Sequence, residues 1–120
     1  MANKLVIMVT HGPEDPEKAT IPFVLAAAAQ ASGVEALLGF QANGVYLLLK
    51  GIAEHVTFPG FAPLKELLDA YREGGGQLLG CGPCLQARKI VAADYIEGVT
   101  VVNAGTFVEQ FVGAKNVLVY

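Results

Sequence analysis

Residues 5–13 read LVIMVTHGP, and this stretch decides how the rest of the sequence is interpreted. Its first part, Leu5 to Val9, is an apolar run rich in β-branched side chains. The polar residues and the Gly-Pro step that follow it are typical of a loop. A short apolar run bounded by such residues predicts a fully buried strand, and a strand without polar alternation is typical of a parallel sheet covered on both faces.

The same order of strand, helix and glycine repeats along the chain. Thr20 is a suitable cap for an Ala-rich helix that runs to Gln30, and Ser32-Gly33 ends it. Further strands are predicted at 36–40, 77–80, 99–102 and 116–120. Further helices are predicted at 45–50, between Pro63 and Gly74, and at 84–92. A last short helix is predicted from a capping box formed by Thr106 and Glu109. Strands alternating with helices predict one three-layer α/β/α domain over residues 1–120, with a five-stranded, mainly parallel sheet.

Composition limits the classes of function. The chain has 120 residues, 53% of them hydrophobic, a mean hydropathy of +0.48 and a net charge of −3. No apolar stretch approaches the roughly 20 residues that span a bilayer, and no run of Lys or Arg could follow a phosphate backbone. We therefore expect a cytoplasmic protein with no membrane or direct nucleic-acid partner, whose apolar surplus lies at subunit interfaces.

Ligands of open parallel α/β sheets bind beyond the carboxyl ends of the strands. This rule selects residues before any motif is considered. It selects His11 after the first strand, 41–44 after the second, 81–84 after the third, and 103–106, beginning with Asn103, after the fourth.

Cys81 is the strongest candidate for chemistry, because it joins a predicted strand to a predicted helix. A thiolate at a helix N-terminus is stabilised by unpaired amides, so we predict a lowered pKa and a nucleophilic sulfur at neutral pH. Arg88 adds a cation that could hold an anionic sulfur group or pair with a carboxylate. Cys84 begins the predicted helix and is expected to be partly buried.

Three other interpretations remain open. Residues 81–84 read CGPC, the dithiol motif of thioredoxin, but the chain has no Trp and no Pro after Cys84, which excludes that fold while leaving a dithiol redox role. A zinc site would need more ligands than the CxxC pair and two distant histidines, His11 and His55, provide. An oligomeric small-molecule binder would place the apolar segment 44–49 in a pocket between subunits.

The chain also resembles the DsrE/DsrF-like proteins, which include TusD-type sulfur carriers. The resemblance is carried by the chain length, the Gly44-Val45 step after the second strand, and an arginine, Arg88, seven residues after Cys81. It implies a Rossmann-like or flavodoxin-like sheet, assembly into trimers or hexamers, and a cysteine, here Cys81, that carries sulfane sulfur as a persulfide. Cys84 has no counterpart in the TusD-like pattern.

We therefore expect a sulfur carrier that needs no cofactor or metal and exchanges sulfur with donor and acceptor proteins or small sulfane-sulfur compounds. The predicted reacting residues are Cys81 and Cys84, and the predicted substrate-binding residues are His11, Gly44, Gly82, Arg88 and Asn103.

Overall fold

The computed structural model describes residues 3–120 and contains one five-stranded sheet. The strands are β1 (Lys4–Val9), β2 (Glu35–Phe40), β3 (Leu78–Cys81), β4 (Val99–Val102) and β5 (Asn116–Val119). They lie in the order β4-β3-β2-β1-β5, and every neighbouring pair is parallel. The expected mainly parallel sheet is therefore entirely parallel.

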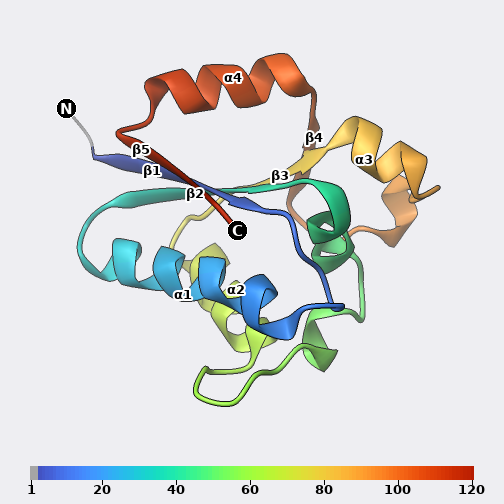
Figure 1. The fold of residues 1–120 in the computed structure, drawn as a ribbon, viewed down its shortest axis with the longest axis horizontal. Helices are drawn as coiled ribbons and strands as arrows, with labels where there is room; N and C mark the ends of the chain where they lie inside the picture. The colour runs from blue at the N-terminus through green and yellow to red at the C-terminus, as the bar shows by residue number, and fades with distance from the viewer. Residues whose placement is uncertain (1–2) are drawn as a thin grey trace.

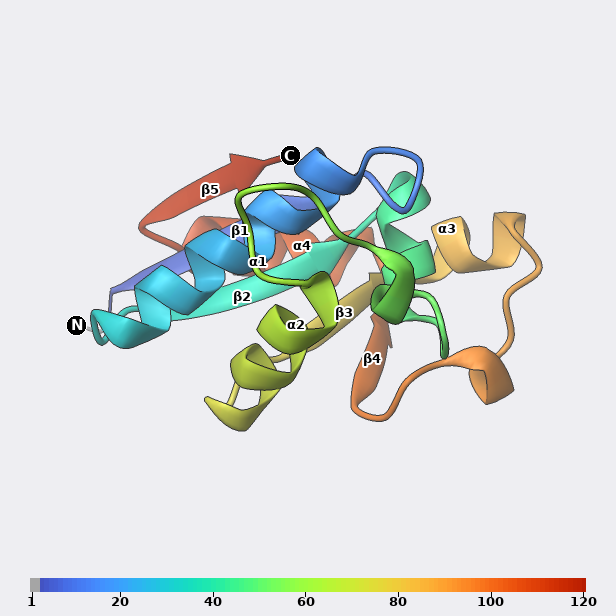
Figure 2. The ribbon, with the colours of Figure 1, turned by 90° about the horizontal axis from the view of Figure 1, so that it is seen from below.

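Helices cover both faces of this sheet. They are α1 (Pro16–Ala31), α2 (Leu64–Glu73), α3 (Gly82–Ala87) and α4 (Ala104–Gly113), with short 3-10 helices η1 (Ala42–Leu48), η2 (Ala53–His55) and η3 (Ala92–Asp94). In Figure 1, α4 lies above the sheet and α1 and α2 lie below it. Figure 2 shows α1 and α2 side by side across the lower face. The three-layer α/β/α fold is confirmed.

The side chains of β1 explain why its sequence is continuously apolar. Ile7 and Val9 are buried in the core on the face of the sheet that α1 and α2 cover. Val6 and Met8 are buried with Phe107 of α4 on the opposite face. Full burial of each such side chain is worth about 1.5–3 kcal/mol relative to exposure. A strand with apolar partners on both sides has no position where a polar residue is favoured.

The first helix begins earlier than predicted. Asp15 is its N-cap and accepts a hydrogen bond from the Lys18 amide at 3.1 Å, which is the usual role of an N-cap carboxylate. Thr20, the predicted cap, lies inside the helix, where its buried hydroxyl donates to the Pro16 carbonyl at 2.7 Å. A threonine side chain can satisfy itself within a helix, so its presence alone does not mark the helix start.

The two later helices also differ from their predicted bounds. The helix α3 ends at Ala87 and not at residue 92, and Cys81 is its N-cap. The cap of α4 is Asn103, whose Oδ1 accepts from the Thr106 amide at 3.1 Å, so Thr106 is already within the helix. Both N-caps lie at the carboxyl edge of the sheet: Cys81 is the last residue of β3, and Asn103 follows β4 directly.

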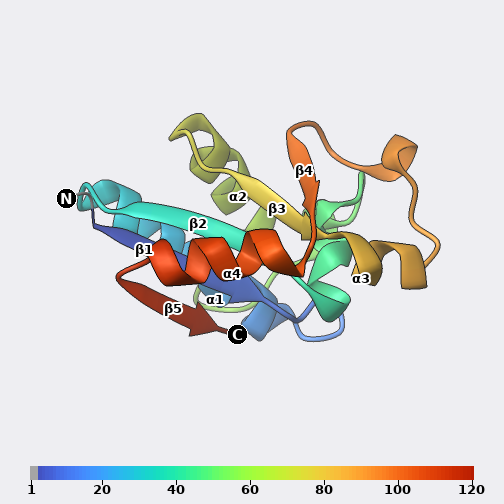
Figure 3. The same ribbon diagram turned by 90° about the horizontal axis from the view of Figure 1, so that it is seen from above.

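The chain topology creates a crevice between β3 and β4. The segment leaving β3 runs on the side of α1 and α2, since Leu85 belongs to that core and the Ile96 amide donates to the Leu48 carbonyl at 2.8 Å. The segment leaving β4 turns to the other face as α4, as Figure 3 shows. Neighbouring strands whose continuations diverge in this way mark the usual ligand site of an open parallel sheet.

In the part of the chain from 3 to 120, no helix has both the length and the apolar character needed to cross a bilayer.

Candidate functional site

Cys81 lies at the carboxyl end of β3, on the crevice between β3 and β4. Its Sγ accepts a hydrogen bond from the Cys84 amide at 3.4 Å, so the sulfur takes the place of an N-cap oxygen. The side chain is partly exposed and packs against both core clusters. The predicted position, at a strand end and a helix start, is what the structure has.

The predicted lowering of the pKa is wrong. Burial raises the pKa of the Cys81 thiol above its ordinary value, and contact with the Cys84 thiol adds to the rise; the Cys84 amide and the charge of Arg88 act in the opposite direction. The physical reason is that α3 has only six residues, so few aligned peptides point at the sulfur, while the apolar residues that pack against the partly exposed side chain disfavour the anion. At neutral pH the resting sulfur is mainly a thiol.

Cys84 is a second free thiol one helical turn away. Its Sγ accepts a hydrogen bond from the backbone amide of Ala42 at 3.3 Å, which joins α3 to the start of η1. Ala42 has a positive φ of 50°, a conformation that is uncommon for a residue with a side chain. The two cysteines therefore accept hydrogen bonds from amides of two different segments.

Arg88 is held firmly at the end of α3. Its Nε and Nη2 donate to Oδ1 of Asn43 at 3.3 and 2.9 Å, and its Nη1 donates to the Cys84 carbonyl at 3.1 Å. The guanidinium carbon also lies 5.7 Å from the centre of the Tyr46 ring. Among residues 3–120, no carboxylate forms an ion pair with Arg88, so no negative side chain there neutralises its charge.

A groove of about 410 Å³ opens beside Cys81 at the crevice. It is lined by residues from α3, β4 and the start of α4, namely Gly82, Pro83, Gln86, Val101, Val102, Asn103 and Thr106. None of these side chains is charged. A methyl group on Gly82 would lie 3.3 Å from the Val102 carbonyl, so glycine allows α3 to begin close against β4.

The other predicted residues lie elsewhere along this edge. Gly44 is buried where η1 meets β1, and a Cβ there would lie 2.0 Å from the Val9 carbonyl. His11 is partly exposed on the loop after β1, with its Nδ1 3.2 Å from Oγ1 of Thr10. The structure therefore places Gly82 and Asn103 on the groove beside Cys81, and it places Cys84 and Arg88 on the η1 side of α3. His11 and Gly44 lie near the end of β1.

Most of the apolar segment 44–49 is buried within the chain itself. Val45, Leu47 and Leu48 are buried in the core of the chain itself. Its 3-10 conformation turns these side chains toward the same core as α1 and α2, which explains their apolar character without a ligand.

Two residues that sequence reasoning left without a role belong to this site. Asn43 and Tyr46 stand in η1, directly after β2, and both contact Arg88. Asn43 falls within the segment 41–44 that the strand-end rule selects, but nothing in the sequence pairs it with Arg88. Within residues 3–120, no three His, Cys, Asp or Glu side chains gather as the ligands of a metal ion would.

Comparison with known proteins agrees with this fold. The sequence profile of the DsrE/DsrF-like family matches residues 3–120. The chain belongs to the DsrE/DsrF-like family. The resemblance seen in the sequence is thereby confirmed, and this family is often associated with sulfur relay.

Two archaeal relatives match much of the chain. The uncharacterized protein MJ0989 of Methanocaldococcus jannaschii is 32% identical over 96 residues, which cover 79% of this chain and 80% of the relative. The uncharacterized protein MK0008 of Methanopyrus kandleri is 28% identical over 117 residues, covering 97% of this chain and 93% of the relative.

A solved structure with the same fold is that of the ychN protein from E. coli. It superimposes with a TM-score of 0.81 at 21% sequence identity, covering 98% of this chain and 99% of the other. At this identity the likeness establishes the DsrE-like fold alone.

Proposed function

We propose that this DsrE-like protein is a cytoplasmic sulfur carrier, in which Cys81 accepts sulfane sulfur and donates it as a persulfide. The observation that supports this most directly is the place of Cys81: a partly exposed sulfur at a strand end, capped by an amide and next to Gly82 and Val102, which line a groove at the crevice of the sheet. Thiols that react in proteins occupy accessible positions of this kind.

Loading is a thiolate exchange. The Cys81 thiolate gives an electron pair to the sulfane sulfur of a donor persulfide, a new S–S bond forms on Cys81, and the old S–S bond of the donor breaks with its thiol as leaving group. Delivery is the same step in reverse, with an acceptor thiolate attacking the outer sulfur and Cys81 leaving. No electrons are gained or lost overall, so the exchange needs no cofactor.

The surroundings of Cys81 suit both steps. The raised pKa means that the resting sulfur stays protonated, while the Cys84 amide and Arg88 favour the anion that attacks or leaves. The uncharged groove beside Gly82 and Asn103 gives a cysteine-bearing loop of a partner protein, or a small sulfane-sulfur compound, room to approach.

A dithiol redox function is the second candidate, because the two free cysteines lie on one helical turn and the Cys84 amide donates to the Cys81 sulfur. The Cys84 thiolate would attack the inner sulfur of a Cys81 persulfide, form the Cys81–Cys84 disulfide and release hydrogen sulfide. An external dithiol would then have to reduce the disulfide before another cycle.

The proposal includes assembly into a homo-oligomer, such as a trimer or hexamer. Within residues 3–120, six valines are exposed, and four of them, Val108, Val112, Val117 and Val119, belong to α4 and β5. Consecutive elements with exposed aliphatic side chains favour contact with further subunits.

Intact-mass measurement after incubation with a low-molecular-weight persulfide tests the carrier. We expect the wild type and Cys84→Ser to gain the mass of one sulfur atom, and Cys81→Ser to gain none. Serine is a favoured N-cap residue, so Cys81→Ser keeps the start of α3 intact.

The same assay separates the two candidates. A wild type that loses two hydrogens by forming a disulfide, with equal loss of activity in both serine variants, would favour the dithiol function. A wild type whose mass never changes would remove the carrier function.

A further inference from the structure

The Arg88 side chain is fixed by a neutral residue that neither motif nor spacing singles out. Oδ1 of Asn43 accepts from both Nε and Nη2 of Arg88, at 3.3 and 2.9 Å. A single acceptor for two nitrogens of the guanidinium fixes the plane of the group as well as its position. The Tyr46 ring and the Cys84 carbonyl complete its surroundings.

Asn43 itself is held by close backbone packing. A Cβ on Gly12 would lie 2.3 Å from the Asn43 carbonyl, and a Cβ on Gly44 would lie 2.0 Å from the Val9 carbonyl. The two glycines therefore let the first turn of η1 lie directly against the end of β1 and the loop that follows. Because that turn has no space to shift, the Asn43 side chain starts from a fixed point.

The chemistry of the amide matters as much as its position. An amide oxygen accepts the two hydrogen bonds that orient the guanidinium but brings no charge of its own. A carboxylate in the same place would make a stronger bidentate pair and cancel the charge of Arg88. An asparagine is therefore the residue that orients an arginine and leaves its field available to a nearby anion.

We propose that Asn43 is a positioning residue, which holds the uncompensated charge of Arg88 where it stabilises the anionic sulfur of Cys81. The inference rests on the proposed function of Cys81 and adds to it the group that keeps the cation in place.

The charged and titratable groups that act on the Cys81 sulfur are few. They are the Cys84 thiol, which raises its pKa, and Arg88, which lowers it; burial is the largest cause of the rise. The groove side, from β4 and the start of α4, contributes Val101, Val102, Asn103 and Thr106, none of which titrates. Within residues 3–120, Arg88 is therefore the one side-chain cation that lowers the pKa of this sulfur.

The test is the pH profile of Cys81 alkylation by iodoacetamide, measured in the Cys84→Ser background so that one thiol reacts. We expect Asn43→Ala and Asn43→Asp each to move the profile to higher pH. At a fixed pH below the midpoint, the rate should fall by roughly three- to tenfold, the effect of about half to one pKa unit. Asn43→Asp is nearly isosteric and keeps a partner for Arg88. If Asn43→Ala unfolds, Asn43→Asp still shows the effect of neutralising the charge of Arg88 in a folded protein.

Two controls show whether Asn43 acts through Arg88. Asn116→Asp makes the same charge change on exposed β5 and should leave the profile within twofold of the parent. In an Arg88→Met background, Asn43→Ala should have no further effect. An unchanged profile in Asn43→Asp, or the full effect of Asn43→Ala persisting without Arg88, would overturn the inference.

Alkylation reports the thiolate whether or not sulfur is carried, so the two proposals fail separately. A shifted profile in a protein that never gains sulfur would remove the carrier function and leave the positioning role. Normal sulfur loading with an unshifted profile would do the reverse.

Discussion

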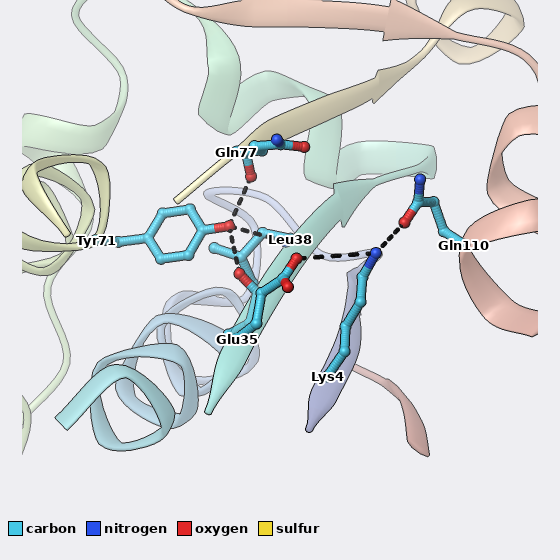
Figure 4. A network of polar contacts seen from close by, with 7 residues as sticks. Lys4, Glu35, Leu38, Tyr71, Gln77 and Gln110 are labelled. Atoms are coloured by element: carbon cyan, nitrogen blue, oxygen red, sulfur yellow. Dashed lines mark hydrogen bonds and ion pairs between the residues drawn. The ribbon is translucent and has the colours of Figure 1, made fainter. Parts of the chain in front are cut away.

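The two ends of the sheet each contain a polar cluster, and the clusters are built in opposite ways. At the amino end the buried Tyr71 hydroxyl accepts from the Leu38 amide at 3.1 Å and lies 2.9 and 2.6 Å from the carbonyls of Ala36 and Gln77 (Figure 4). At the carboxyl end the Cys81 sulfur accepts one amide hydrogen bond at 3.4 Å and remains partly exposed.

The difference separates a structural network from a reactive one. Burial raises the pKa of Tyr71 to about 12, so the hydroxyl stays protonated at any physiological pH and fastens β2 to the segment entering β3. Burial also raises the pKa of Cys81, and an amide opposes the rise at both sites, but only at Cys81 does a cation, Arg88, oppose it as well. A closed network holds the strands in place; an open one leaves an atom able to change its bonding partner.

Removing the Tyr71 hydroxyl should have the largest effect on stability and none on reactivity. Tyr71→Phe leaves a buried amide and two carbonyls without that partner, so we expect a loss of about 1–3 kcal/mol in the free energy of unfolding. Urea denaturation measures it, and the alkylation rate of Cys81 should stay within twofold of the wild type.

Tyr120→Phe is a matched control, because Tyr120 binds Thr10 through its backbone carbonyl, which the substitution retains. It should change stability far less. A Tyr71→Phe protein as stable as the wild type would show that the amino end does not depend on this network.

At the carboxyl end of the sheet, the pH dependence of Cys81 alkylation should show how this reactive site differs from the structural network around Tyr71. Since the thiolate is the reactive form and its pKa is raised, alkylation in the Cys84→Ser protein should quicken about tenfold per pH unit near neutrality. The rate should level off only above the ordinary thiol pKa of about 8.5. A free cysteine peptide is the reference, and a half-maximal rate below about pH 7 would contradict the dominance of burial over Arg88.

The sequence is informative about this molecule wherever one local pattern is enough. The apolar run 5–9 predicts a strand buried on both faces, and glycines and prolines place most of the remaining elements. The strand-end rule selects the segments that hold Cys81, Asn103 and Asn43, since it depends only on the order of strands and helices. These inferences need no knowledge of which side chains meet.

Sequence reasoning fails where two opposing effects must be weighed, or where residues far apart in the sequence come into contact. The sign of the Cys81 pKa shift depends on the balance between six residues of helix and the aliphatic packing around the sulfur, which only the fold determines. The pairing of Arg88 with Asn43 joins residues 45 positions apart. Thr20 and Thr106 resemble caps, but each lies inside its helix because a nearby acidic or amide side chain takes the capping position.

The smallest effect is expected at the surface of the amino end. Lys4 contacts Gln110, and its Nζ lies 3.9 Å from a carboxylate oxygen of Glu35, whose side chain is 58% exposed (Figure 4). Such a pair is screened by water and contributes about 0–1 kcal/mol, and Lys4 keeps Gln110 when the charge is removed. Glu35→Gln should therefore change the free energy of unfolding by less than about 0.5 kcal/mol in urea denaturation, and added salt should shrink the difference. A larger loss that added salt does reduce would mean that the ion pair, and not the Tyr71 hydroxyl alone, fastens this end of the sheet.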